Sequence, residues 1–127
     1  MLSKDEQFIL KQINQYREAH DLKPIKEDKK AAKYAWQRVK EIQDDWSHEG
    51  FLKNAPYLPA VENLARNYKT NKEVVEAWIK SPSHNENLLN KDINRMGIKI
   101  NNGYVAMEGR KAQFYEPLFE TIAGLIK

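Results

Sequence analysis

A chain of 127 residues has the size of one domain and is long enough to bury a core without disulfides. Hydrophobic residues make up 41% of it and charged residues 31%, which is typical of a globular protein and not of a disordered or membrane-embedded one. Its 21 basic and 18 acidic residues are scattered, so no nucleic-acid-binding role is expected. The absence of cysteine excludes disulfides and thiolate chemistry.

The start of the sequence carries charge where a signal peptide needs an apolar core. Residues 1–6 read Met-Leu-Ser-Lys-Asp-Glu, and no apolar run in the chain reaches the length of a membrane span. We therefore expect no transmembrane segment. A mature fragment, or export by another route such as a phage particle, would be compatible with this start.

A capping signature followed by helical spacing predicts a first helix. Residues 3–6 contain the serine and glutamate of a capping box. Ile9, Ile13 and Tyr16 follow at steps of four and three residues. We expect this helix to end near His20, whose imidazole would interact favourably with the helix C-terminus.

A second helix is expected to begin near Asp28 and to pack against the first. Its apolar positions recur at three- and four-residue steps, at Ala32, Ala35, Val39 and Ile42. From Asp44 to Lys69 this periodicity breaks, and Gly50 with two prolines predicts a long irregular segment. Loops of that length in a compact domain tend to carry function.

Two further helices are predicted before the C-terminal part. Thr70 begins a capping box for a helix that ends at Pro82 and buries Trp78. Ser81 is expected to cap a short helix whose first turn carries His84.

The C-terminal part of the sequence predicts a β-hairpin and a last helix. Residues 96–100 and 104–108 alternate around an Asn-Gly turn, and Glu116-Pro117 introduces the helix. The apolar residues of that helix share one face: Leu118, Ile122, Leu125 and Ile126. Helices packed on a small, mainly antiparallel sheet give an α+β fold. We divide the chain into a domain of residues 1–110 and a C-terminal helical extension of residues 111–127.

Five short phrases stand in an order and spacing that chance rarely produces. They are residues 13–17 (Ile-Asn-Gln-Tyr-Arg), 46–50 (Trp-Ser-His-Glu-Gly), 62–65 (Glu-Asn-Leu-Ala), 73–89 and Met96-Gly97. Together they resemble the bacterial SCP-like branch of the CAP superfamily, which is named for cysteine-rich secretory proteins, antigen 5 and pathogenesis-related 1 proteins. The resemblance leaves the tail from Lys111 outside.

The resemblance implies an α-β-α sandwich with a cleft lined by two histidines and, in many members, two glutamates. His48 and His84 match the histidines, and Glu62 matches the first glutamate. Ser81 stands where the second glutamate would be, and we expect it to cap a helix rather than bind metal. Val61 replaces the glycine that usually precedes Glu62.

The same resemblance implies that the cleft can hold a divalent cation, with zinc as the first choice. His48, Glu62 and His84 would then supply three ligands and leave a fourth position for water. Such a water can act as a nucleophile. The alternative is a hydrogen-bonded cluster without metal, in which Glu62 fixes the tautomers of the two imidazoles.

Aromatic residues close to these positions are candidates for the cleft wall. Trp46 stands beside His48, and Tyr57 and Tyr68 flank Glu62. Trp78 is expected in the core instead. The apolar stripe of the last helix would pack on its own domain or on a second chain, which makes an oligomer through this helix a second option.

We therefore expect a binding or interaction module that holds a divalent cation, a small ligand or lipid, or a segment of a protein partner. A metal-assisted hydrolase of peptide, cell-wall or ester bonds is the alternative, with Glu62 as ligand or general base. The residues identify no catalytic group. A third hypothesis is an accessory structural component of a phage or cell-surface assembly. The resemblance points to an extracellular or cell-surface location.

Overall fold

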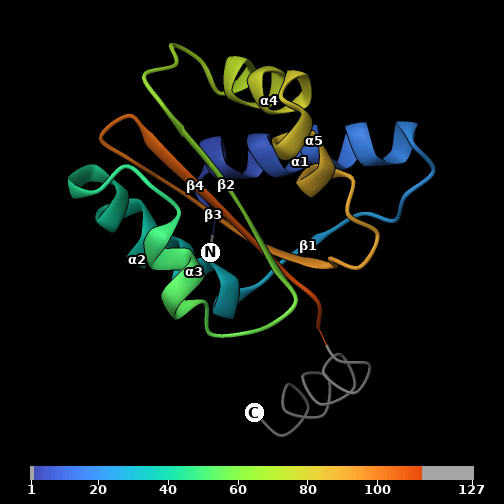
Figure 1. Cartoon of the computed structure of the whole chain (residues 1–127). Coiled ribbons are helices and arrows are strands. Elements are labelled where there is room, and N and C mark those ends of the chain that lie inside the picture. Colours follow the sequence, from blue (N-terminus) through green and yellow to red (C-terminus); the bar gives the residue numbers. More distant parts are fainter. Residues whose placement is uncertain (1, 113–127) are drawn as a thin grey trace, which may run out of the picture.

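The protein is a sheet enclosed between two layers of helices (Figure 1). The computed structural model describes residues 2–112. On one face of the sheet lie α1 (Lys4–Ala19), α4 (Asn71–Lys80) and α5 (Pro82–Leu88). On the other lie α2 (Lys29–Asp44) and the short α3 (Glu49–Asn54). This confirms the α+β class and the α-β-α sandwich expected from the sequence.

The sheet has four strands in the order β1-β3-β4-β2. They are β1 (Lys26–Glu27), β2 (Ala60–Arg66), β3 (Arg95–Asn101) and β4 (Tyr104–Arg110). β3 and β4 form the predicted antiparallel hairpin, β2 adds to β4 in antiparallel fashion, and β1 pairs with β3 in parallel. The hairpin turn has positive φ at both Asn102 and Gly103, as a tight two-residue turn requires. β2 is therefore an edge strand, and the candidate site lies along it.

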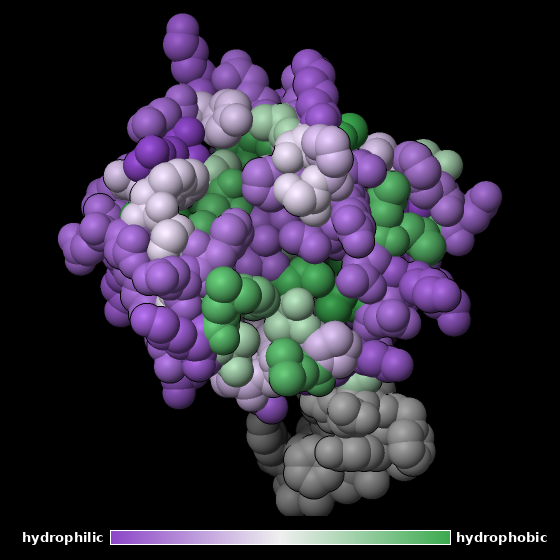
Figure 2. Space-filling model, viewed as in Figure 1, coloured by the Kyte–Doolittle hydropathy of each residue, from purple (hydrophilic) through white to green (hydrophobic). Residues whose placement is uncertain are grey.

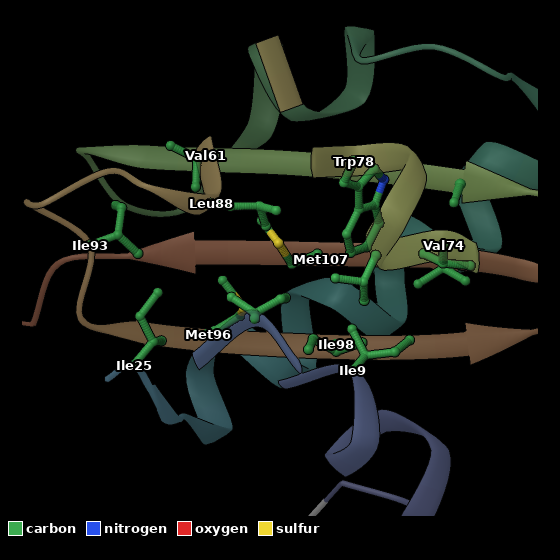
Figure 3. Close-up of a cluster of buried hydrophobic side chains, with 14 of the residues drawn as sticks. Ile9, Ile25, Val61, Val74, Trp78, Leu88, Ile93, Met96, Ile98 and Met107 are labelled. Carbon is green, nitrogen blue, oxygen red and sulfur yellow. The ribbon is translucent and has the colours of Figure 1, made fainter. Parts of the chain in front are cut away.

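The main hydrophobic core lies between the sheet and the layer of α1, α4 and α5 (Figure 3). Its labelled members are Ile9, Ile25, Val61, Val74, Trp78, Leu88, Ile93, Met96, Ile98 and Met107. The expectation that Trp78 is a core residue is confirmed, since only 1% of it is exposed. Its indole nitrogen donates a hydrogen bond of 3.0 Å to the carbonyl of Leu64, so the polar end of the ring is satisfied.

Polar residues of the first helix fix the connection that follows it. The Asn14 side chain bonds both the N–H and the C=O of Ile25. Arg17 is buried and donates to the carbonyls of Lys23, Leu88 and Asn90. The helix ends at Ala19 with His20 as its C-cap, as predicted. Asn14 and Arg17, within the phrase of residues 13–17, therefore stabilise the fold.

Helix α2 packs directly on the sheet through a glycine. Gly97 of β3 faces α2, and a β-carbon at this position would overlap the backbone of Ala31 and Ala32. α2 thus lies on the face opposite to α1, and the expectation that these two helices pack on each other is wrong. Each helix is amphipathic, and each buries its apolar stripe against its own face of the sheet.

The segment from Asp44 to Lys69, predicted to be irregular, contains α3 and the whole of β2. The prediction failed because β2 is buried on both faces, so its sequence does not alternate between apolar and polar residues. Two of its buried side chains, Glu62 and Asn63, are themselves polar.

The predicted C-terminal helix, the extension of residues 111–127 and an oligomer contact through it fall almost entirely outside the described residues. Within residues 2–112, none of the helices combines the length and the apolar character that crossing a bilayer requires.

Replacing Gly97 by alanine is expected to destabilise the protein by about 1–3 kcal/mol, because the added methyl group must push α2 away from β3. Gly109→Ala is the comparison and should cost less, since its β-carbon would come closest to side-chain atoms of Val61 and Ile93, at 2.8 and 2.9 Å, and not to helix backbone. Urea unfolding measures both. Equal losses in the two variants would contradict the close helix–sheet contact.

Candidate functional site

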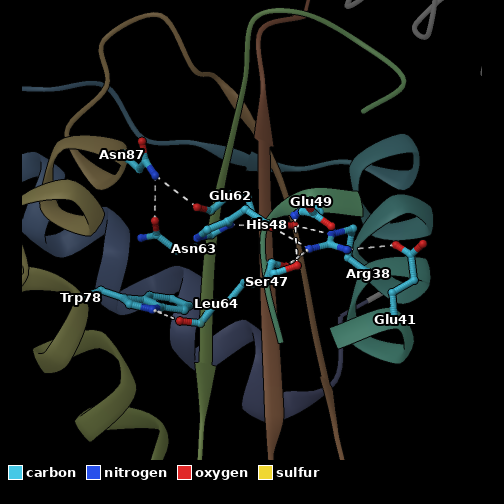
Figure 4. Close-up of polar contacts among 10 residues, drawn as sticks. All are labelled: Arg38, Glu41, Ser47, His48, Glu49, Glu62, Asn63, Leu64, Trp78 and Asn87. Atoms are coloured by element: carbon cyan, nitrogen blue, oxygen red, sulfur yellow. Dashed lines mark hydrogen bonds and ion pairs between the residues drawn. The ribbon is translucent and has the colours of Figure 1, made fainter. Parts of the chain in front are cut away.

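A buried ion pair anchors the centre of the site (Figure 4). Glu62 points from β2 toward α2, where Arg38 binds its carboxylate with two parallel hydrogen bonds. The distances are 2.7 Å from Nε to Oε2 and 2.9 Å from Nη2 to Oε1. The exposed fraction of the side chain is 2% for Arg38 and 0% for Glu62. This fork geometry fixes the carboxylate in both position and orientation.

His48 binds one oxygen of the same carboxylate. It occupies the N-cap position of α3, and its Nδ1 lies 2.8 Å from Oε1 of Glu62. Arg38 also donates to the carbonyl of Ser47, so it holds the loop that carries the histidine. Gly50 permits this approach, because a β-carbon there would overlap the Arg38 guanidinium. Nearly half of the His48 side chain, 49%, remains exposed.

Hydrogen bonds to β2 place His84 on the other side of the strand. Asn63 donates to the carbonyl of His84, and Asn87 donates both to the side chain of Asn63 and to the carbonyl of Glu62 (Figure 4). The first turn of α5 is thereby fastened to the edge strand. No hydrogen bond to the His84 imidazole occurs within residues 2–112.

The environment sets the charge state of both Glu62 and His84. Burial by itself would raise the pKa of Glu62, but the hydrogen bonds from His48 and Arg38 outweigh it and lower the pKa to about 2. Burial, assisted by the nearby His48, lowers the pKa of His84. At neutral pH the site therefore holds an ionised carboxylate and a neutral His84 imidazole.

These positions do not fit a three-ligand metal centre. Both carboxylate oxygens of Glu62 already accept hydrogen bonds, from Arg38 and His48. Within residues 2–112, no group of three histidine, aspartate or glutamate side chains is placed to hold an ion. Of the hydrogen-bonded cluster that the sequence left as the alternative, the described residues contain the His48–Glu62 bond but no bond from Glu62 to the His84 imidazole.

A pocket of about 240 Å³ opens beside β2, next to His84. It is lined by Trp46, Leu64, Ala65, Arg66, Tyr68, Ala77, Trp78, Ser81 and His84. Trp46 and Tyr68 keep 39% and 46% of their surface exposed, so two aromatic rings remain available at its wall. The Arg66 guanidinium lies 4.3 Å from the centre of the Trp46 ring, a cation–π contact that holds both side chains in place.

Some of the residues predicted to line the cleft line the pocket, and others do not. Trp46, Tyr68, Ser81 and His84 line the pocket, whereas Tyr57 does not. The Tyr57 hydroxyl is buried, and its ring packs edge-on against Tyr34 of α2. Ser81 occupies the N-cap position of α5, as predicted, but its side chain makes no capping hydrogen bond.

Sequence reasoning missed Arg38, Arg66, Asn87 and Glu108. Arg38 had a readable signal, because it lies three residues after Ala35 and four before Ile42, on the buried stripe of α2. An arginine on a buried stripe implies a buried carboxylate as its partner. The other three gave no comparable signal.

The face seen in Figure 1 is mostly hydrophilic, with small, separate hydrophobic patches (Figure 2). It shows no broad apolar area of the kind that large protein interfaces or membrane contacts need.

Comparisons with known proteins agree with this architecture. The model of the family described as "CAP: Cysteine-rich secretory protein family" matches residues 10–107. The uncharacterized protein YkwD of Bacillus subtilis (strain 168) is 30% identical over 112 residues, which are 79% of this chain and 42% of that protein. The chain spans less than half the length of the curated relatives it matches.

Two solved structures share the fold. An extracellular protein containing a SCP domain from Bacillus anthracis str. Ames superposes with a TM-score of 0.76 at 21% identity, over 85% of this chain and 40% of that chain. An outer surface protein from Borrelia burgdorferi superposes with a TM-score of 0.72 at 21% identity, over 87% of this chain and 95% of that chain.

Replacing Arg38 by methionine is expected to lower the free energy of unfolding by about 3–5 kcal/mol, because the buried Glu62 loses its cation. Glu41→Gln is the control, since it removes only the half-exposed partner of Arg38 and should cost less than about 1 kcal/mol. Urea denaturation at neutral pH compares the two variants. A loss in Arg38→Met no larger than that in the control would show that the ion pair is not an anchor.

Proposed function

Because the chain belongs to the CAP family of cysteine-rich secretory proteins, we propose that it is a binding module which holds a small ligand in the pocket beside β2. The proposal depends on one observation. In the wall of this pocket, two exposed aromatic rings lie beside polar side chains that have no hydrogen-bond partner in residues 2–112.

The side chains of the pocket favour a flat ring that carries an anionic group. Trp46 and Tyr68 offer ring faces for stacking. Arg66 supplies a cation that forms no ion pair within the described residues, and its planar fork suits a carboxylate. The neutral His84 imidazole and the Ser81 hydroxyl can each donate or accept a hydrogen bond. A sugar ring that bears a carboxylate combines these requirements.

The edge of the sheet is protected against the addition of a partner strand, which also favours a small ligand. The outward carbonyls of Glu62 and Leu64 accept hydrogen bonds from the side chains of Asn87 and Trp78. A peptide that added to β2 as a further strand would have to displace both. Recognition by side chains in the pocket avoids this cost.

The names of two structural neighbours, an extracellular protein and an outer surface protein, support placing this activity outside the cell or at its surface.

N-acetylmuramic acid, compared with the uncharged N-acetylglucosamine, is a suitable probe pair because the two differ by a carboxylate-bearing substituent. We expect the acid to perturb the Trp46 indole signal in ¹H–¹⁵N spectra and to bind more tightly than the neutral sugar. Trp46→Ala should weaken binding about tenfold, the equivalent of roughly 1.4 kcal/mol. Arg66→Met should abolish the preference for the acid.

Trp36→Ala is the matched control, because Trp36 is an exposed tryptophan on α2, 43% accessible, that does not line the pocket. The proposal fails if neither sugar perturbs the pocket signals, or if Trp36→Ala weakens binding as much as Trp46→Ala.

A divalent cation held by the two imidazoles is the second candidate. Nδ1–H of His48 donates a hydrogen bond to Glu62, which leaves the exposed Nε2 able to coordinate a metal. Histidines that bind metals are commonly supported by a carboxylate in this way. The influence of His48 on the pKa of His84 supports the proximity of the two rings. Water or a bound partner would complete the coordination. The hydrolase hypothesis depends on this ion to activate water.

Zinc titration by calorimetry tests the second candidate. The wild type is expected to bind one equivalent of zinc, and either His48→Ala or His84→Ala should weaken that binding at least about tenfold. His20→Ala is the control, because His20 lies at the end of α1 and bonds the carbonyl of Tyr16. Equal zinc binding in all four proteins would rule out this cation site.

A further inference from the structure

A second glutamate lies behind the site, and no ion pair to it occurs within residues 2–112. Glu108 lies in β4 with 0% of its surface exposed. Neither of its carboxylate oxygens accepts a hydrogen bond from a donor. A buried carboxylate without donors is strongly disfavoured, so its state requires an explanation.

The register of the sheet places Glu108 beside Glu62. The two residues are direct partners in the antiparallel pairing of β4 with β2, and Gly97 is the partner of Glu108 on β3. Directly opposed residues project from the same face of a sheet, with β-carbons about 5 Å apart. Both carboxyl groups therefore point toward α2, into the same buried layer.

The charges around this layer are already balanced without Glu108. Arg38 of α2 is paired with Glu62, and Arg110 of β4 is paired with Asp28, at 2.6 Å. Each of these two cations thus has a carboxylate of its own.

The remaining groups that face Glu108 cannot supply a positive charge. Glu41 of α2 adds a further negative charge near Arg38. Tyr34 of α2 and Tyr57 of the loop before β2 are neutral, because burial raises the pKa of both hydroxyls. Gly97 contributes no side chain.

We propose that Glu108 keeps its acidic hydrogen at neutral pH and donates it to Glu62, so that the two glutamates form one carboxyl–carboxylate pair behind His48. A carboxylic acid is the one form of Glu108 that can hydrogen-bond to a carboxylate at this position. The pair then carries a single negative charge, which Arg38 balances. Burial, followed by interaction with Glu62, raises the pKa of Glu108 well above its ordinary value, in agreement with this arrangement.

Glu108 is in this view a positioning residue. Its acidic hydrogen adds a further hydrogen bond to the carboxylate that Arg38 holds, and Glu62 in turn orients His48 through Nδ1. The inference concerns the support of the cleft and does not depend on which ligand the pocket takes.

The direct test is the infrared carbonyl band of a protonated carboxylic acid, recorded on the full chain at neutral pH. This band is separate from the bands of ionised carboxylates. It should be present in the wild type and in the control Glu41→Gln, whose side chain is more than one-third exposed, and absent in Glu108→Gln. A wild-type spectrum without the band would overturn the proposal.

The dependence of stability on pH gives an independent readout. Above the ordinary glutamate pKa of 4.5, the folded state keeps the Glu108 hydrogen and the unfolded state loses it, so rising pH favours unfolding of the wild type. Glu108→Gln cannot ionise and lacks this contribution. The ratio of the wild-type unfolding constant to that of Glu108→Gln should therefore rise about tenfold per pH unit above that value. A ratio that does not change with pH would overturn the proposal.

A third variant tests the positioning role. Glu108→Gln keeps an N–H donor toward Glu62 and should retain the His48 Nδ1 proton signal in NMR spectra, whereas Glu108→Leu removes the donor and should weaken that signal. Equal signals in both variants would refute the positioning role. If the leucine variant does not fold, the infrared band and the pH dependence of Glu108→Gln still decide the hydrogen-bond claim, and neither requires a ligand.

Discussion

The pairing of Arg38 with Glu62 is the constraint on which the site depends. An edge strand does not ordinarily bury a carboxylate, and an isolated one would cost several kcal/mol. The Arg38 guanidinium offsets the cost of burying the Glu62 carboxylate, because it binds both carboxylate oxygens. It also donates a hydrogen bond to the carbonyl of Ser47. One arginine on α2 thereby fixes the edge strand, the loop after the helix, and the histidine that follows this loop.

The cleft is assembled from two halves that the sheet holds apart. On the α2 side, Glu62 orients His48. On the other side, the amides of Asn63 and Asn87 fasten α5 to β2 and place His84 beside the pocket. The pocket borders an edge strand whose outward carbonyls at Glu62 and Leu64 are already bonded, so this edge is protected against the addition of another strand.

The sequence predicted the elements with strong local signals and missed the one that carries the central carboxylate. Capping residues and periodicity gave α1 and α2, and the Asn-Gly turn gave the hairpin, because these signals act within a few residues. β2 was not predicted, because its register is set by pairing with β4 and both of its faces are buried. Only the family resemblance identified His48, Glu62 and His84. No local sequence pattern could show that Arg38 binds both carboxylate oxygens of Glu62.

A crystal structure of the protein grown with zinc, with the anomalous signal of the metal recorded, tests the central claim that Glu62 is a structural anchor and not a free ligand. The account predicts that both oxygens of Glu62 stay within hydrogen-bond distance of Arg38, and that any zinc lies on the imidazoles alone. A carboxylate that has turned away from Arg38 to coordinate the metal would contradict it.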